Sequence, residues 1–378
     1  MKIFILYSRI FDFEGKNLTL GGIQTYLLNL AIMLRDNNYF PVIYQSATSN
    51  WKINYENIPV FGIKINEQLN LKAQRKQVFN ELLQTYKKED IVIWGTDTIA
   101  IPNEKVNSIL INHGITFDHF FIHGKKYELL SKFGLTQLIM YLERKKAIDS
   151  FMNAKTKVCV DYNFLNWIRT FEPRSKLQNI HVIPNFTHKS TIANISKSDN
   201  NIIRILFARR FNKGRGVYIL EKIVKEITKK YDNVSFTVAG DGELKSYIIQ
   251  NIGNNSKVEV IKYEHSESLK IHAKHDIALV PSIFSEGTSL SLLEAMTAGC
   301  VPIASNVGGM TNIILDKYNG FLVNPDAEEF IEKIELLIQN QDLRQNMSKN
   351  AKNSADEAFS YEIWSAKWLN VIEETINP

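Results

Sequence analysis

Short apolar segments alternate with longer amphipathic segments along most of the chain. In the first part, segments rich in Ile and Val lie at 2–6, 41–46, 90–95 and 108–114. Between two of them, Ile23, Leu27, Leu30 and Leu34 recur at spacings of four, three and four, which places them on one face of a helix. The alternation predicts a parallel sheet covered by helices.

The same alternation starts again after residue 201. Strand-like segments lie at 203–210, 234–240, 258–263, 277–282 and 301–305, with helical segments at 216–231 and 290–296. The stretch between the two halves, 187–201, is rich in Ser, Thr, Asn and Lys, which is typical of a linker. A chain of 378 residues is longer than one core usually organises. We therefore predict a domain at 1–186, a linker at 187–201 and a domain at 202–359.

Composition narrows the class of protein only a little. Hydrophobic residues make up 44% and charged residues 22%, as in ordinary globular proteins. The net charge of +5 is mild, so it favours phosphate-bearing partners weakly and gives no reason to expect nucleic acid. The apolar start at 2–6 is too short for a signal peptide, and Cys159 and Cys300 are too far apart in sequence to indicate a disulfide framework or a zinc site. We expect a cytoplasmic protein.

The segment 119–146 mixes aromatic residues, basic residues and a helical apolar period. We expect its apolar side chains to face a core; they are Leu130, Phe133, Leu138, Tyr141 and Leu142. The basic side chains would then form a solvated face; they are Lys125, Lys126, Lys132, Arg144, Lys145 and Lys146. A membrane-surface patch is the alternative.

Ligands of open parallel sheets bind outside the carboxyl ends of the strands, where helix N-termini present free N–H groups. Gly21 and Gly22 open the first helix and would allow a phosphate or sugar to approach the backbone, although they could also form a simple turn. His113 directly follows a strand-like segment and could bind a sugar hydroxyl or be a structural histidine. Asp118 and His119 are weaker candidates for the same edge.

A cluster of cations follows the strand-like segment at 203–208. Its members are Arg209, Arg210, Lys213 and Arg215. Guanidinium groups can hold a diphosphate through paired hydrogen bonds, so the cluster suits such a ligand. A solvent-exposed basic loop is the alternative.

The stretch SEGTSLSLLEAMTAGCVPIAS, at 285–305, places Glu286 before a helix and Glu294 inside it. Thr288 or Ser289 can cap the helix and Gly299 can end it. A helix N-terminus favours an ionised Glu286, and an ionised carboxylate accepts hydrogen bonds from ligand hydroxyls. An acid and nucleophile pair of the glycosidase type is the alternative.

These motifs together resemble a retaining glycosyltransferase of the GT-B fold, specifically of the glycosyltransferase family 4 type. The likeness covers nearly the whole chain and is strongest in the E-x7-E signature formed by Glu286 and Glu294, followed by NVGGM and YNGFLV. The paired glycines at 21–22, INHG, VIPNF, VAGDGE and KYEHSESL support it. The resemblance implies an α/β fold of two Rossmann-like doubly wound domains that face each other across a cleft. It also implies that the last helix, within 360–378, packs back on the first domain.

The resemblance implies a role for each matched residue. Arg210 and Arg215 would neutralise the donor diphosphate, Glu286 would contact the hydroxyls of the donor sugar, and Glu294 would hold the ribose. Further donor contacts would come from Gly21, Gly22, Gly287, Thr288, Ser289, Leu290, Tyr263 and His265, with His113 near the sugar and the acceptor. Three places depart from the pattern: Arg209 stands where a glycine is common, TSL at 288–290 where Phe-Gly-Leu is frequent, and Asn312 where a glutamate is common.

The implied reaction is transfer of a sugar from a nucleotide-diphosphate donor to a hydroxyl of a glycan or lipid-linked acceptor, with retention of anomeric configuration. It would need no metal and no other cofactor, and it would serve the synthesis of cell-surface polysaccharide in the cytoplasm or at the inner face of its membrane. A catalytically silent relative that acts as a binding or scaffold protein is the alternative. A dinucleotide-dependent oxidoreductase is a second one, weakened because no G-x-G-x-x-G follows a strand.

Overall fold

The computed structural model describes residues 1–19, 21–117, 132–188, 202–264 and 267–376. These residues form two compact units. Unit 1 contains 1–113, 132–183 and 365–376, and unit 2 contains 114–117, 184–188, 202–264 and 267–364. The chain passes between the units at Ile183 and Pro184, and it also does so after His113 and after Trp364. Most of the predicted linker, 189–201, lies outside the described residues.

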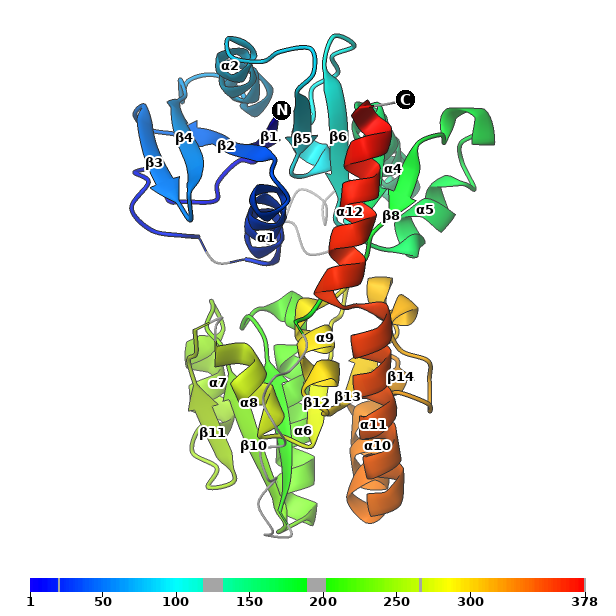
Figure 1. Ribbon diagram of the computed structural model, residues 1–378. Helices are drawn as coiled ribbons and strands as arrows, with labels where there is room; N and C mark the ends of the chain where they lie inside the picture. Colours follow the sequence, from blue (N-terminus) through cyan, green and yellow to red (C-terminus); the bar gives the residue numbers. More distant parts are fainter. Residues whose placement is uncertain (20, 118–131, 189–201, 265–266, 377–378) are drawn as a thin grey trace. The chain divides into compact units, whose positions relative to one another are not determined.

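Unit 1 is built on a sheet whose described strands follow the order β3-β4-β2-β1-β5-β6-β7-β8 (Figure 1). The strands are β1 (Lys2–Leu6), β2 (Phe40–Ala47), β3 (Trp51–Tyr55), β4 (Ile58–Lys64), β5 (Ile91–Trp94), β6 (Asn107–Asn112), β7 (Thr156–Cys159) and β8 (Ile180–Val182). Neighbours are parallel except for β3 and β4, which form an antiparallel hairpin. Its turn residues Glu56 and Asn57 both have positive φ angles, as a two-residue hairpin turn requires.

The helices of unit 1 are α1 (Gly22–Asp36), α2 (Leu71–Leu83), α4 (Thr136–Phe151) and α5 (Tyr162–Ile168), with short 3-10 turns at Asp97–Ile99 and Arg174–Lys176. Helix α1 buries Leu27, Leu30 and Leu34 as the spacing predicts, whereas Ile23 is only half-buried. Helix α12 (Tyr361–Ile376) belongs to unit 1 from Ser365 onwards. Within unit 1, the buried Trp368 of α12 donates its Nε1–H to Tyr26 Oη of α1 at 2.8 Å.

Helix α4 does not have the orientation that the apolar period predicts. Phe133, Leu138, Tyr141 and Leu142 are 71, 54, 58 and 52% exposed, so the expectation that they face a core is wrong. The opposite side of the helix faces the unit, and the helix ends at Phe151, which is fully buried against Phe164 of α5. Apolar residues therefore lie on both sides of α4, and the period alone could not indicate which side is buried. Leu130, Lys125 and Lys126 lie outside the described residues.

Unit 2 is built on a parallel sheet whose described strands follow the order β11-β10-β9-β12-β13-β14 (Figure 1). The strands are β9 (Ile203–Ala208), β10 (Val234–Ala239), β11 (Val258–Ile261), β12 (Ile277–Val280), β13 (Val301–Ser305) and β14 (Phe321–Val323). Side chains alternate across β9: Ile205 and Phe207 join the larger core, while Leu206 and Ala208 face the other side. All but β14 coincide with segments that the apolar pattern predicts.

Helices cover both faces of this sheet. They are α6 (Val217–Lys230), α7 (Lys245–Ile252), α8 (Ser268–Ala273), α9 (Leu290–Thr297), α10 (Ala327–Gln339) and α11 (Gln341–Ala358), with 3-10 turns at Lys213–Arg215 and Gly308–Asn312. The apolar sides of α6, α7 and α10 form the larger core with the sheet. Helices α9 and α11 share a second core with Met310 and Ile314.

Gly216 fixes the path of the chain from the cation-rich loop into α6. It has a φ angle of +79° and precedes the first helical residue. A Cβ at this position would overlap the carbonyl oxygen of Pro281, which lies directly after β12. The loops after β9 and β12 are therefore packed against each other at their backbones.

We predict that Gly216→Ala lowers the free energy of unfolding by at least about 2 kcal/mol, because the left-handed conformation costs a non-glycine residue about 1–2 kcal/mol before the overlap is counted. Gly214→Ala is the matched control, since its Cβ would lie 3.5 Å from Phe284, an ordinary contact. Thermal unfolding of both variants checks this. Equal midpoints for the two variants would contradict the packing described here.

Candidate functional site

The loops at the carboxyl ends of the strands of unit 2 are packed without space for side chains between them. A Cβ on Gly308 would overlap the backbone of Glu286, and the N–H of Gly309 donates to the carbonyl oxygen of Glu286 at 2.6 Å. A Cβ on Gly240 would likewise overlap the carbonyl oxygen of Arg209. The glycines of VAGDGE and NVGGM therefore bring the segments around Arg209 and Glu286 into place.

The carboxylate of Glu286 lies at the centre of these loops. Arg209 Nη2 donates to both of its oxygens, at 2.6 and 2.7 Å. Arg215 Nη1 forms an ion pair with Oε2, and the Ser282 hydroxyl donates to Oε1. The side chains of Arg209 and Glu286 are 5 and 11% exposed, whereas that of Arg215 is 36% exposed.

These partners decide the charge of Glu286. Burial by itself raises the pKa of this carboxyl, but Arg209, Arg215 and the Ser282 hydrogen bond outweigh it and lower the pKa to about 2. The carboxylate is therefore ionised across the physiological range, as its position beside a helix start predicts.

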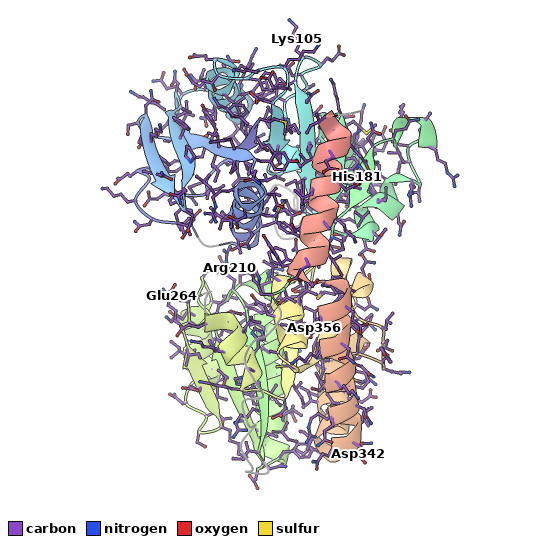
Figure 2. The ribbon with its side chains drawn as sticks, viewed as in Figure 1. Lys105, His181, Arg210, Glu264, Asp342 and Asp356 are labelled. Atoms are coloured by element: carbon purple, nitrogen blue, oxygen red, sulfur yellow. The ribbon has the colours of Figure 1, made fainter. Side chains whose placement is uncertain are left out.

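The sequence did not indicate which of two adjacent arginines is buried. The exposed residue is Arg210, to which the resemblance assigns the diphosphate, and the buried partner of Glu286 is Arg209. Figure 2 places Arg210 and Glu264 at the same end of unit 2, which is the end where the strands finish. The pattern of charges carries no signal for this distinction, because both arginines follow β9 directly.

Glu294 has a different environment from Glu286. It lies in the second turn of α9 and accepts a hydrogen bond from the Ser268 hydroxyl at 2.7 Å. Burial raises its pKa to about 7, and the Ser268 hydrogen bond offsets this only in part. A neutral and an ionised carboxyl would also suit a glycosidase pair, but the oxygens of Glu286 are both held by cations, which leaves a poor nucleophile.

The start of α9 lies beside Glu286, and its residues are largely buried. Of the two residues that could cap α9, Ser289 occupies the N-cap position, but its side chain makes no capping hydrogen bond. The hydroxyls of Ser289 and Ser291 lie 3.4 Å apart instead. Gly287, Thr288 and Leu290 complete this segment, and the carbonyl of Thr288 accepts a hydrogen bond from Asn185 Nδ2. Gly299 ends the helix with a φ angle of +75°, as predicted.

Tyr263, which the resemblance places beside the nucleotide base, follows β11 and packs with Ile261 and Ile271 on one face of the sheet. Burial raises the pKa of its hydroxyl to about 12, with a smaller contribution from the charge of Glu294. Tyr263 is thus near Glu294 and neutral. His265 lies outside the described residues.

The remaining predicted residues belong to unit 1. Gly21 is the N-cap residue of α1 and Gly22 its first residue, and a Cβ on Gly22 would have no atom of the described residues within 4 Å. His113 Nε2 lies 2.8 Å from the carbonyl oxygen of Gly95, and its ring meets Tyr26 edge-on at 5.5 Å. Burial lowers the pKa of His113 to about 4, so the ring is neutral and, with its proton on Nε2, offers Nδ1 as an acceptor.

The sequence reasoning missed buried polar residues at the same edge of the sheet in unit 1. Asn112 Nδ2 donates to Asp97 Oδ2 at 2.9 Å, and burial raises the pKa of Asp97. Asp161 follows β7 and caps α5 with its Oδ1, while its buried Oδ2 has no hydrogen-bond partner among the described residues. The position of Asp161 directly after a strand-like segment was the signal available for finding it.

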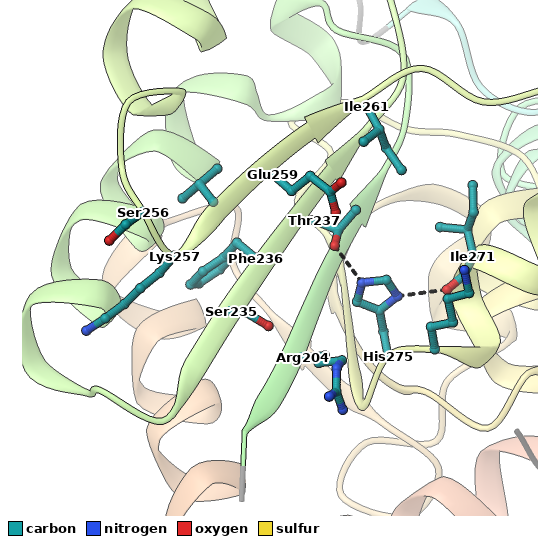
Figure 3. Close-up of a pocket in the computed structure, with 12 residues that line it drawn as sticks. Arg204, Ser235, Phe236, Thr237, Ser256, Lys257, Glu259, Ile261, Ile271 and His275 are labelled. Carbon is teal, nitrogen blue, oxygen red and sulfur yellow. Dashed lines mark hydrogen bonds between the residues drawn. The ribbon is translucent and has the colours of Figure 1, made fainter. Parts of the chain in front are cut away.

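A cavity of about 430 Å³ lies elsewhere on unit 2, toward the amino ends of β9, β10 and β11 (Figure 3). Two of its polar side chains are already partnered. His275 bonds Thr237 Oγ1 at 2.8 Å and Ile271 O at 2.7 Å. Lys257 donates to two carbonyl oxygens and to Asp232. None of its lining residues belongs to the cluster around Glu286, so the cavity is separate from that cluster, and we assign no ligand to it.

The described residues contain no group of three or more His, Cys, Asp or Glu side chains arranged to hold a metal ion. They also contain no helix with the length and apolar character needed to cross a membrane.

Comparison with known proteins bears on this site directly. Residues 188–354 match the glycosyl transferases group 1 family. The match covers Arg209, Arg215, Glu286 and Glu294, and it ends within α11.

The glycosyl transferases group 1 match agrees with individual relatives. The uncharacterized glycosyltransferase MJ1178 of Methanocaldococcus jannaschii is 28% identical over 356 residues, 91% of this chain and 92% of that protein. Two others from the same organism, MJ1607 and MJ1069, are 28 and 30% identical, but the chain spans only 43 and 48% of their length.

Solved structures show the fold. Sucrose-phosphate synthase from Thermosynechococcus elongatus has a TM-score of 0.78 at 14% identity and covers 100% of this chain and 99% of its own. Anabaena HepE in complex with UDP-glucose has a TM-score of 0.71 at 17% identity, and the comparison covers 100% of this chain and 99% of the HepE chain. The chain therefore has the α/β GT-B fold that the sequence predicts.

Because Glu286 and Glu294 have opposite environments, replacing them should change the stability of the protein at high pH in opposite directions. The raised pKa of Glu294 means that the folded state prefers the neutral form of this carboxyl. The contribution of Glu294 to the free energy of unfolding is therefore present below pH 4.5 and lost as pH rises through 7. We predict that Glu294→Gln is more stable than wild type at pH 8 by about 2 kcal/mol, after allowance for partial exposure, and nearly equal to it at pH 4.5. Urea unfolding at the two pH values measures this.

Glu286→Gln is the matched control for that experiment. Because the pKa of Glu286 is lowered, its ionised form stabilises the folded state above pH 4.5, and we expect the variant to be less stable than wild type at pH 8. If both variants shift in the same direction at pH 8, the assigned charge states are wrong.

Proposed function

We propose that the protein transfers a sugar from a nucleotide-diphosphate donor to a hydroxyl of a glycan or glycolipid acceptor, as a hexosyltransferase of the retaining family 4 type. The observation that carries the proposal is the cation-rich loop after β9 packed against the ionised Glu286 at the start of α9. Such an arrangement stabilises negative charge, and a nucleotide-diphosphate sugar develops that charge when it loses its sugar. Anabaena HepE and a TarM variant from S. aureus, which share this fold, have structures with UDP.

The residues of unit 2 then have distinct roles. Arg210 and Arg215 bind the diphosphate, and the backbone N–H groups at Gly287, Thr288, Ser289 and Leu290 contact phosphate and sugar. Glu294 accepts a hydrogen bond from the ribose, with Tyr263 and His265 beside the base. For unit 1 we keep the roles that the resemblance implies, with Gly21 and Gly22 as donor contacts and His113 near the sugar and the acceptor.

The reaction proceeds on one face of the sugar. The bond between the anomeric carbon and the diphosphate oxygen breaks, the acceptor hydroxyl oxygen bonds to the same face of that carbon, and the departing diphosphate takes the hydroxyl proton. No separate base is required. Because Arg210 and Arg215 compensate the charge of the leaving group, we propose that the reaction needs no metal. Proton NMR of the product, which reports anomeric configuration, and assays in EDTA test these two points.

We predict that one class of sugar nucleotide, among UDP-, GDP-, ADP- and dTDP-linked sugars, raises the melting temperature of the wild type. A ligand at a hundred times its dissociation constant stabilises a protein by about 2.7 kcal/mol. Arg210→Ala should lose this effect because it removes a diphosphate contact. Lys229→Ala is the matched control, since Lys229 is an exposed cation at the far end of α6.

The panel also tests the alternatives. A sugar nucleotide that binds without being hydrolysed or transferred to any glycan in a mixed acceptor library would indicate a catalytically silent binding protein. A shift with a nicotinamide dinucleotide and none with a sugar nucleotide would overturn the proposal in favour of an oxidoreductase.

We further propose that the protein works in cell-surface polysaccharide synthesis, at the inner face of the cytoplasmic membrane, where α4 contacts the lipid surface. Leu135, Leu138, Tyr141 and Leu142 are 40, 54, 58 and 52% exposed and share one side of the helix. Exposed lysines accompany them at positions 132, 145 and 146. An exposed apolar side with basic neighbours suits an anionic membrane surface.

We predict that the protein floats with phosphatidylglycerol vesicles at low salt and much less with phosphatidylcholine vesicles. Leu138→Glu combined with Leu142→Glu should abolish flotation, because charged side chains cannot enter the lipid interface at that face. Leu71→Glu is the control, since Leu71 is 66% exposed but lies on α2. Absence of wild-type flotation at low salt would contradict this proposal.

A further inference from the structure

The carboxylate of Glu286 has no capacity left for a ligand in this structure. A carboxylate offers about four lone-pair positions. Arg209 uses two through its bonds at 2.6 and 2.7 Å, Arg215 uses one and the Ser282 hydroxyl uses one. The role that the resemblance gives Glu286, accepting hydrogen bonds from sugar hydroxyls, therefore requires one of these partners to leave.

Only one cationic partner is placed to leave. Arg209 is 5% exposed and bonds both oxygens, so its removal would leave a buried, uncompensated charge. Arg215 bonds one oxygen and is 36% exposed, and ion pairs open to solvent are weak. The two arginines thus hold the same carboxylate with very different strength.

The net charge of the cluster around Glu286 indicates that an anion would draw Arg215 away from the carboxylate. Two guanidinium groups face one carboxylate, so the cluster carries one excess positive charge. Arg209 Nη1 is also buried without a hydrogen-bond partner among the described residues. When Arg215 moves to an anion, Arg209 and Glu286 remain as a neutral pair and no charge is left uncompensated.

We propose that Arg209 is a positioning residue that holds Glu286 permanently, and that Arg215 is an exchangeable counterion that moves from Glu286 to the diphosphate of the donor. The exchange frees Glu286 Oε2 for a donor hydroxyl only after the diphosphate has bound. This inference rests on the proposed function, since it takes the ligand to be a nucleoside diphosphate group.

The exchange makes Glu286 and the diphosphate competitors for Arg215. We predict that Glu286→Gln, which weakens the hold on Arg215, tightens binding of UDP about tenfold, in the range of couplings between contacting residues. In the Arg215→Met background, the same change should alter UDP affinity less than threefold. Isothermal titration calorimetry with UDP, and with GDP and ADP in parallel, measures the four proteins of this cycle.

A second set of variants tests Arg209, and here the expected change in UDP affinity has the opposite direction. In Arg209→Met, Arg215 becomes the sole cationic partner of Glu286 and is held more tightly, so we expect UDP to bind about tenfold more weakly. Adding Glu286→Gln should restore the affinity, and Arg209→Lys should restore part of it. A residue with a merely structural role would not be rescued by removing the charge of Glu286. If Glu286→Gln does not fold, Glu286→Asp replaces it, because the shorter side chain withdraws the carboxylate from Arg215.

The outcomes separate the inference from the function on which it rests. Equal tightening by Glu286→Gln in the presence and absence of Arg215 would indicate a general charge effect and overturn the exchange alone. Failure of the double variant to regain affinity would overturn the positioning role of Arg209. If none of the three diphosphates binds the wild type, the proposed function fails and the exchange fails with it.

Discussion

A single buried carboxylate, that of Glu286, organises the ligand end of unit 2. Its burial is tolerated because Arg209 and Arg215 supply opposite charge at contact distance, which lowers its pKa to about 2. The segments that carry these residues follow two different strands, β9 and β12, and they approach closely because glycines replace side chains where the backbones meet. Loss of the ion pairs would leave an unpaired buried charge at the point where these loops converge.

Glu294, eight residues later, shows how one short sequence can hold two carboxyl groups in different states. Its carboxyl accepts a hydrogen bond from the Ser268 hydroxyl, and burial raises its pKa to about 7. In the proposed function this difference is useful, since a fixed anion orders the cations of the donor site while a carboxyl near neutrality binds a hydroxyl without strong repulsion of the nearby diphosphate. The stability that Glu294 costs above neutral pH is of the kind that binding sites commonly carry.

Much of this architecture could be predicted from the sequence because parallel strands are buried on both faces and read as continuous apolar segments. The strands β9 to β13 coincide with predicted segments, and Gly299 ends α9 as expected. The hairpin β3–β4 was missed because its exposure alternates, so it lacks the continuous apolar segment by which the buried strands were found. Its turn is also Glu-Asn rather than a glycine turn. Tertiary packing decides which side of α4 is buried and which of Arg209 and Arg210 is buried. Neither periodicity nor charge spacing encodes this packing.

The most direct test of this account is the pKa of the Glu286 carboxyl, measured by carbon-13 NMR of glutamate-labelled protein with Glu286→Gln to assign its resonance. We predict that the Glu286 resonance does not titrate above pH 3, because two arginines hold the ionised form, while the Glu294 resonance titrates near pH 7. A Glu286 resonance that titrates at or above the ordinary value of 4.5 would mean that the arginines do not hold the carboxylate in solution. The arrangement proposed for the donor site would then be wrong.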